Sequence, residues 1–149
     1  MTVPAELAVL LAGRPQPGES EQAFPFLTVD EAGFPHVALL SRAEVDVMPD
    51  GSCVLAVLAS RRTRANLTRS GRAGLIAISG TTAHYAKLRV LSEIETPAAT
   101  GCVLQVIEYK ADTLGIALSP INFLTSHELA GREDWEASGQ LLGRLASPT

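Results

Sequence analysis

Six short segments with the pattern of β-strands follow one another along this sequence, and a single short helical segment interrupts them. Some alternate apolar and polar residues, which is typical of a strand with one buried face, and others are continuous apolar runs, which are typical of strands buried on both faces. The predicted strands are residues 24–29, 36–48, 53–59, 73–79, 83–95 and 102–110, and the helix is 63–69. This series predicts a mainly β fold, a small barrel with few open edges.

Helices are also predicted at both ends, so the expected architecture is a β-barrel with flanking helices. Residues 1–13 combine an early proline with regularly spaced leucines, and residues 125–146 begin with a capping box and continue with a helical apolar stripe. The segment 13–22 is rich in proline and glycine and is predicted to be a loop. A length of 149 residues fits one domain, 1–149, with its barrel core at 24–110.

The segment 36–48 has the longest alternation and is predicted to form one long strand. Its buried face is expected to carry Val37, Leu39, Ala43, Val45 and Val47, and its solvent face Arg42, Glu44 and Asp46.

The composition excludes several classes of protein. Apolar residues make up 46% of the sequence and charged residues 19%, so the chain is expected to fold. The apolar run 53–59 is far shorter than the ~20 residues of a membrane span, and residues 1–13 lack the basic start of a secretory signal. Two cysteines cannot build a disulfide framework, and the three histidines lack metal-ligand spacing, so no metal site is expected. The expected compartment is the reducing cytoplasm.

Positive charge is concentrated in one part of the chain. The net charge is −4, yet residues 51–92 contain no acidic residue and hold seven of the twelve Lys and Arg residues. Such a segment is expected to bind an anion, although a solvated helix face would have the same pattern. Nucleic acid is not favoured, because the chain is acidic overall and Tyr85 is the only aromatic residue in the segment.

The centre of this segment has the features of a phosphate site. A predicted strand ends near Ala59, and Ser60, Arg61, Arg62 and Thr63 lead into the predicted helix. A helix N-terminus presents free N–H groups and a partial positive charge, to which these side chains would add hydroxyl and guanidinium donors. The alternative is that Thr63 only caps the helix and the arginines are solvated.

The run Ser60-Arg61-Arg62-Thr63-Arg64-Ala65-Asn66-Leu67, followed by Gly71-Arg72-Ala73-Gly74-Leu75, resembles the pyridoxamine 5′-phosphate oxidase-like family of flavin-binding split barrels. The segments 24–30 and 33–37 resemble the first hairpin of that family, and the order of the strands agrees. The resemblance implies a six-stranded split β-barrel of the FMN-binding type. It also implies a homodimer with FMN in clefts at the subunit interface.

The resemblance also implies site residues. The strand that lines the flavin ring corresponds to His36, Val37, Ala38, Leu39, Leu40 and Ser41, and the phosphate site to Leu58, Ala59, Ser60, Arg61, Arg62 and Thr63. Lys87 would reach the flavin from the other subunit. Thr63 stands where the family often has a lysine, for which Arg61 or Arg64 could compensate.

The function expected from this resemblance is that of a flavoprotein, a redox enzyme acting on a small-molecule substrate through FMN. Pyridoxine phosphate oxidation is disfavoured, because the Arg-x-His pattern of those oxidases is absent near the C-terminus. Two alternatives remain open. One is a reductase of the same fold that uses the deazaflavin F420, whose longer anionic tail suits extra arginines. The other is a non-enzymatic flavin- or haem-binding module, with haem disfavoured because only lone histidines could be its ligand.

Overall fold

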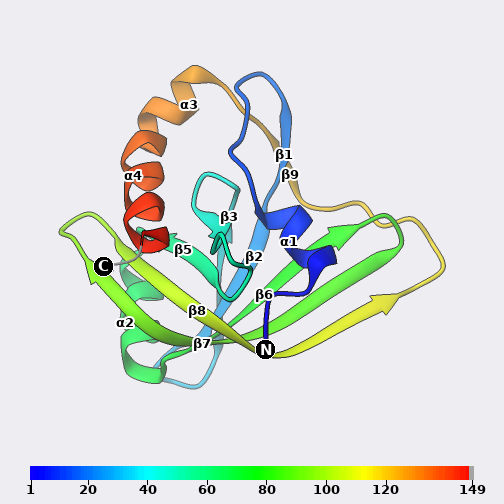
Figure 1. The fold of residues 1–149 in the computed structure, drawn as a ribbon, viewed down its shortest axis with the longest axis horizontal. Coiled ribbons are helices and arrows are strands. Elements are labelled where there is room, and N and C mark those ends of the chain that lie inside the picture. Colours follow the sequence, from blue (N-terminus) through cyan, green and yellow to red (C-terminus); the bar gives the residue numbers. More distant parts are fainter. Residues whose placement is uncertain (148–149) are drawn as a thin grey trace.

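The computed structural model describes residues 1–147, and their main feature is a curled antiparallel sheet of seven strands in the order β3-β2-β6-β7-β8-β5-β4 (Figure 1). Its strands are β2 (Phe24–Val29), β3 (Pro35–Leu40), β4 (Val45–Val47), β5 (Val54–Leu58), β6 (Arg72–Ser79), β7 (Thr82–Glu95) and β8 (Thr100–Thr113). Two register shifts between β7 and β8, after Lys87 and Val90, are bulges that increase the local twist and help the sheet to curl. The result is a half-barrel with β3 and β4 as its edges.

The sheet has seven strands rather than the predicted six because residues 36–48 do not form one strand. A turn separates β3 from β4, with Val45 N–H donating to the carbonyl of Ser41 at 3.0 Å. The Glu44 carboxylate accepts from both the N–H and the hydroxyl of Ser41 (2.8 and 2.6 Å), which stabilises the turn against an extended strand. Val37 and Leu39 on β3 are 52% and 54% exposed, whereas Ala43 in the turn and Val45 on β4 are fully buried.

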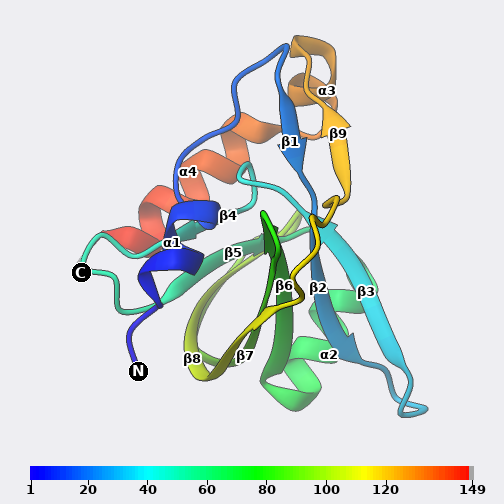
Figure 2. The same cartoon turned by 90° about the vertical axis from the view of Figure 1, so that its right-hand side faces the viewer.

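Two apolar clusters hold the strands and helices together. The larger fills the inside of the half-barrel and includes Phe24, Phe26, Leu88 and Leu104, with α1 (Ala5–Leu11) closing one end. The smaller lies between α4 (Trp135–Ala146) and the outer side of β5 and β8 (Figure 2). Helix α4 approaches β8 closely at Gly101, where an added Cβ would lie 3.0 Å from Leu141 Cγ.

Helix α2 (Arg61–Ser70) confirms the predicted helix 63–69 and extends it at both ends. Ser60 is its N-cap, with the Oγ atom accepting from Thr63 N–H at 3.5 Å, and the left-handed Gly71 (φ 67°) ends it. The Asn66 amide donates to Thr28 Oγ1 at 3.0 Å, so the buried side of α2 is fixed against β2. The start of the helix is therefore held at the end of β5.

The C-terminal region differs from the single helix predicted for 125–146. It forms α3 (His127–Arg132), capped by Ser126, and α4, with a break at Asp134 (φ 51°), whose carboxylate accepts from Ala137 N–H at 3.3 Å. Sequence reasoning also missed a second, two-stranded sheet of β1 (Ser20–Gln22) and β9 (Asn122–Leu124). Strand β1 lies in the segment predicted as a loop, because its partner lies about a hundred residues away in the sequence.

Candidate functional site

A cleft of about 460 Å³, here called the main cleft, lies where the end of β3, the β5–α2 junction, the β7–β8 turn and α4 meet. Its floor is apolar, with Leu39, Leu40 and Val57, and polar side chains surround it. The lining is completed by Ala38, Glu44, Ala59, Ser60, Thr96, Ala98, Ala99, Glu133, Asp134, Ala137, Ser138, Gln140, Leu141 and Arg144. A cleft of this size is in the range that holds a small organic cofactor.

The main cleft brings together the two segments predicted to bind the ring and the phosphate of a flavin. From the first segment it contains Ala38, Leu39 and Leu40, and from the second Ala59 and Ser60. These residues are about twenty apart in the sequence, and the sheet places them on one wall.

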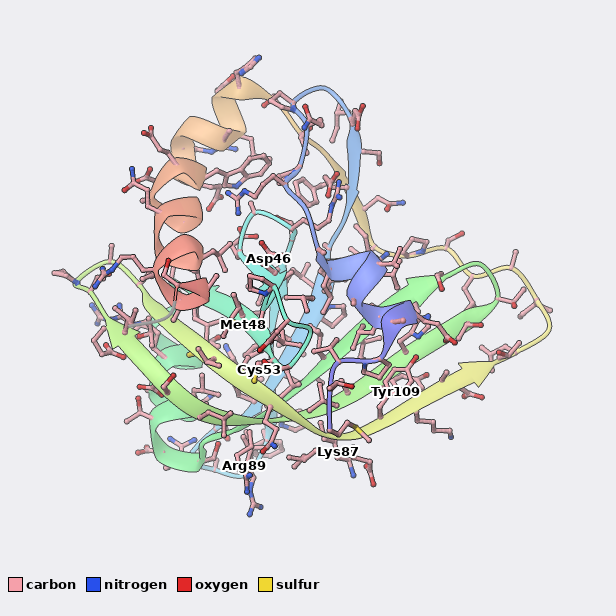
Figure 3. The ribbon with its side chains drawn as sticks, viewed as in Figure 1. Asp46, Met48, Cys53, Lys87, Arg89 and Tyr109 are labelled. Carbon is pink, nitrogen blue, oxygen red and sulfur yellow. The ribbon has the colours of Figure 1, made fainter. Side chains whose placement is uncertain are left out.

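Other predicted site residues lie elsewhere. Leu58 is 1% exposed and belongs to the core of the half-barrel, because it points to the opposite side of β5 from Val57. His36 and Val37 stand further along β3 and do not line the main cleft. Lys87 projects outward from β7 (Figure 3) and pairs with Glu108 at 2.6 Å on the exposed side of the sheet. Any contact of Lys87 with a ligand would therefore be made from this outer face.

Of the predicted phosphate residues at the start of α2, Ser60 lines the main cleft, whereas Arg61, Arg62 and Thr63 do not. Within residues 1–147, Arg61 and Arg62 are exposed and have neither a hydrogen-bonded partner nor an ion-pair partner. Thr63 is fully buried, and its Oγ1 atom has no hydrogen-bond partner. Thr63 N–H also donates to Ser60 Oγ, so the donor set that suits a phosphate consists of the two free guanidiniums and the remaining first N–H groups of a ten-residue helix.

Arg64, which had been considered as a further phosphate ligand, is engaged elsewhere. Its guanidinium donates to Thr100 Oγ1 at 2.9 Å, to the Thr96 carbonyl at 2.8 Å and to the Glu95 carboxylate at 3.1 Å. These bonds fix the β7–β8 turn, whose residues Thr96, Ala98 and Ala99 form one lip of the main cleft. Arg64 therefore holds this lip of the main cleft in place through its hydrogen bonds.

The wall opposite Ser60 was missed by sequence reasoning. It is made by α4, which contributes Ser138, Gln140 and the exposed Arg144. The spacing of Trp135, Ser138, Leu142 and Leu145 predicted the helix and assigned Ser138 to its apolar stripe. The polar residues Gln140 and Arg144, which lie between those positions, were the available signal for a polar wall. Their approach to β3 depends on tertiary packing at Gly101, so the sequence alone did not indicate it.

Glu44 was predicted to face solvent, and this is wrong. Its carboxylate lies partly buried in the main cleft, where Ser41 holds one of its oxygens. Burial raises the pKa of Glu44 above its ordinary value, and the hydrogen bonds from Ser41 oppose this shift. The negative charge of Glu133 raises the pKa of Glu44 further, and the positive charge of Arg14 lowers it. Glu44 is therefore a carboxyl group that lines the cleft and binds a proton more tightly than an ordinary glutamate does.

The outer side of the β2–β3 hairpin exposes apolar side chains. Val29, Val37 and Leu39 are each about half exposed, and Phe34 at the turn is 67% exposed. Val37 and Leu39 are two apart on β3 and therefore face the same way, next to Leu27 and Pro25 of β2 by register. Contiguous exposed apolar surface of this kind is typical of a protein interface.

His84 is not positioned as a haem or metal ligand. His84 is 1% exposed, and both ring nitrogens are engaged, with Ser79 Oγ at 2.8 Å and Tyr109 Oη at 2.6 Å. No group of three or more His, Cys, Asp or Glu side chains is arranged to hold a metal in this part of the chain. The helices described there are also too short or too polar to span a membrane.

Comparison with solved structures finds a similar fold in two reductases and in a monooxygenase component. The styrene monooxygenase flavin reductase SMOB from Pseudomonas putida matches with a TM-score of 0.54 and 16% identity over 84% of this chain and 95% of its own. An F420 reductase matches with a TM-score of 0.54 and 14% identity over 72% of this chain and 98% of its own. Nitrilotriacetate monooxygenase component B from Mycobacterium thermoresistibile matches with a TM-score of 0.54 and 12% identity, covering 72% and 77%.

Comparisons of the sequence with known families and proteins find no match: no protein-family model matches the chain, and no curated protein matches it. The resemblance to flavin-binding split barrels is nevertheless confirmed at the level of the fold. The chain therefore has the split-barrel fold that flavin reductases share with an F420 reductase.

Proposed function

We propose that this protein is a homodimeric flavoprotein that binds FMN in the main cleft and carries out redox chemistry on a small-molecule substrate. The observation that supports this most strongly is the position of Ser60. It caps α2 at one end of a cleft whose floor is Leu39, Leu40 and Val57, so a phosphate donor set adjoins an apolar surface suited to a planar ring.

Each part of the cleft has a separate task in this proposal. Arg61, Arg62 and the first N–H groups of α2 bind the phosphate, and the floor excludes water from one face of the ring. Arg144, on the α4 wall, supplies a cation on the other side of the cleft. When bound, the flavin would supply the hydride- or electron-transferring atoms, and the protein contributes orientation and electrostatics.

The homodimer is part of the proposal because the exposed apolar side of β2–β3 adjoins the main cleft at Leu39. A second copy packed on this face would cover the open side of the cleft. Val37 would then be an interface residue rather than a ring contact within its own subunit.

The deazaflavin F420 is the second candidate cofactor. Arg61, Arg62 and Arg144 all lack ion-pair partners within residues 1–147, and three free guanidiniums are more than one phosphate needs. Relative affinities of the protein for FMN and F420, measured by titration, separate the two.

The test is the absorption spectrum of the purified protein and its change on titration with FMN. Saturable binding of FMN supports the proposal, and oxidation of reduced nicotinamide with bound flavin supports an enzyme rather than a binding module. A Soret band would assign the cleft to haem. A colourless protein that binds neither FMN nor F420 would overturn the proposal.

A further inference from the structure

A second pocket of about 370 Å³, here called the side pocket, adjoins the main cleft. The two share Leu39, Leu40, Glu44 and Glu133, so an occupant of one would contact an occupant of the other. The remaining walls are Ala23, Ser41, Ile121, Asn122, Phe123, Leu124, Leu129 and Trp135. They come from the β1–β2 junction, the turn after β3, β9 and the residue before it, α3 and the start of α4.

The walls of the side pocket are mainly apolar and its only charges are negative. Phe123, Leu129 and Trp135 provide aromatic and aliphatic surface, and Glu44 and Glu133 stand at the boundary with the main cleft. None of the twelve lining residues is Lys, Arg or His.

Arg144 lines the main cleft together with Glu44 and Glu133, but no ion pair to either carboxylate occurs within residues 1–147. Arg14 donates to the carbonyls of Ala43 and Trp135 at 2.9 and 3.0 Å, and Arg42 pairs with Glu21 at 2.6 Å. Both donors from Ser41 go to Oε2 of Glu44, and no hydrogen bond to its Oε1 occurs within residues 1–147. This oxygen is free to accept a hydrogen bond from a ligand.

We propose that the side pocket binds a small apolar molecule that carries a protonated amine. The apolar body packs against Phe123, Leu129 and Trp135, and the ammonium group donates to Glu44 and Glu133. An anionic ligand would place like charges together beside Glu44 and Glu133, and no Lys, Arg or His lines the side pocket to compensate them. That the ligand is the substrate of a flavin bound in the main cleft rests on the proposed function; the binding itself does not.

Trp135 allows a direct test, because it is the only tryptophan in the chain and lines the side pocket. The probes are phenethylamine and hydrocinnamate, which share a phenyl ring and differ in the sign of their charge at neutral pH. Phenethylamine is expected to change the Trp135 fluorescence saturably and to bind at least about tenfold more tightly than hydrocinnamate, as a charge-assisted hydrogen bond requires.

Variants then locate the amine. Glu133→Gln and Glu44→Gln should each reduce the affinity for phenethylamine about tenfold while the affinity for hydrocinnamate does not fall. Glu136→Gln, an exposed residue of α4 that lines neither pocket, is the matched control and should bind both probes as the wild type does.

Three results would overturn the proposal. They are equal affinity for the two probes, no fluorescence response to either, or a response that depends only on protein concentration, which would assign the side pocket to a second copy of the chain. FMN titration of the same samples, followed by visible absorbance, keeps the two proposals separate. If the protein binds the amine but not FMN, only the proposed function is overturned. If it binds FMN but not the amine, only this inference is overturned.

Discussion

Arg42 holds the buried carboxylate of Glu21 with two parallel hydrogen bonds, from Nε to Oε1 at 2.8 Å and from Nη2 to Oε2 at 2.6 Å. The pair ties the turn after β3, which carries Glu44, to β1 of the small sheet. The bonds to Glu21 raise the pKa of Arg42. The two partners differ in exposure, 29% for the Arg42 side chain and 5% for Glu21, and this difference predicts unequal effects of mutation.

Arg42→Ala should be the more destabilising change, because it leaves a buried carboxylate without a partner. We expect a loss of about 3 kcal/mol of unfolding free energy for Arg42→Ala, the low end for breaking a buried pair. Glu21→Gln keeps a hydrogen-bond acceptor for Arg42, whose side chain reaches solvent. We therefore expect it to lower the unfolding free energy by only about 1 kcal/mol. Denaturant unfolding at neutral pH measures both, and equal losses would contradict the asymmetry.

Stability should depend on pH through Glu44. Since its pKa is raised in the folded state, the folded chain binds the proton more tightly than the unfolded chain does. Stability from this group is complete below the ordinary pKa of glutamate and is lost as pH rises through the raised folded value. Glu44→Gln removes the titration, so the stability of the variant minus that of the wild type should increase from pH 4 towards pH 7. Glu136→Gln, at an exposed position of α4, is the matched control in the same unfolding series. A stability difference for Glu44→Gln that does not change with pH would show that its carboxyl is not held as described.

Gly101 sets the distance between β8 and α4. An added Cβ would lie 3.0 Å from Leu141 Cγ and 3.1 Å from Leu145 Cδ1, so Gly101→Ala should cost about 1–3 kcal/mol by overpacking. Gly143→Ala in the same helix meets no heavy atom within 4 Å and should be neutral or stabilising, by up to about 1 kcal/mol. Thermal unfolding of the two variants compares them directly. If Gly101→Ala leaves the stability unchanged, α4 can move away from β8 without loss of unfolding free energy.

Arg62→Ala tests the phosphate end of the main cleft. Removing this guanidinium should weaken FMN binding about tenfold or more, the contribution of a charge-assisted hydrogen bond, and leave riboflavin binding unchanged because riboflavin has no phosphate. Arg72→Ala, an exposed arginine on β6 outside the cleft, is the control. Equal losses for the two ligands would show that Arg62 does not bind the phosphate.

Val37→Lys tests the proposed dimer. A charge placed in the apolar face of β2–β3 should convert a dimer into a monomer in sedimentation or light scattering, because an unpaired charge would be buried in the interface. Val9→Lys, on the exposed side of α1 and 78% exposed in the wild type, should leave the assembly unchanged. A wild type that is already monomeric would refute this part of the proposed function.

Local sequence was sufficient for much of the fold. The alternation of β7, with Tyr85, Lys87 and Arg89 outward and His84 and Leu88 buried, follows from the period of two along a strand. Helix α2 was predicted over 63–69, and the left-handed Gly71 that ends it is a local signal because such a cap acts within one turn. The pairing of Ala38 and Leu39 with Ala59 and Ser60 around one cleft followed from the resemblance to a family rather than from periodicity.

The rest was decided by contacts between residues distant in the sequence. Strand β1 exists because β9 pairs with it, and the turn at Ser41 exists because Glu44 folds back on it where alternation predicted a continued strand. The five arginines of 61–72 look alike in the sequence, yet Arg64 and Arg69 are held by the distant Thr100 and Val29, whereas Arg61 and Arg62 remain free within residues 1–147. Periodicity reports which face of an element is apolar, whereas the partner that a polar side chain finds depends on how the elements pack.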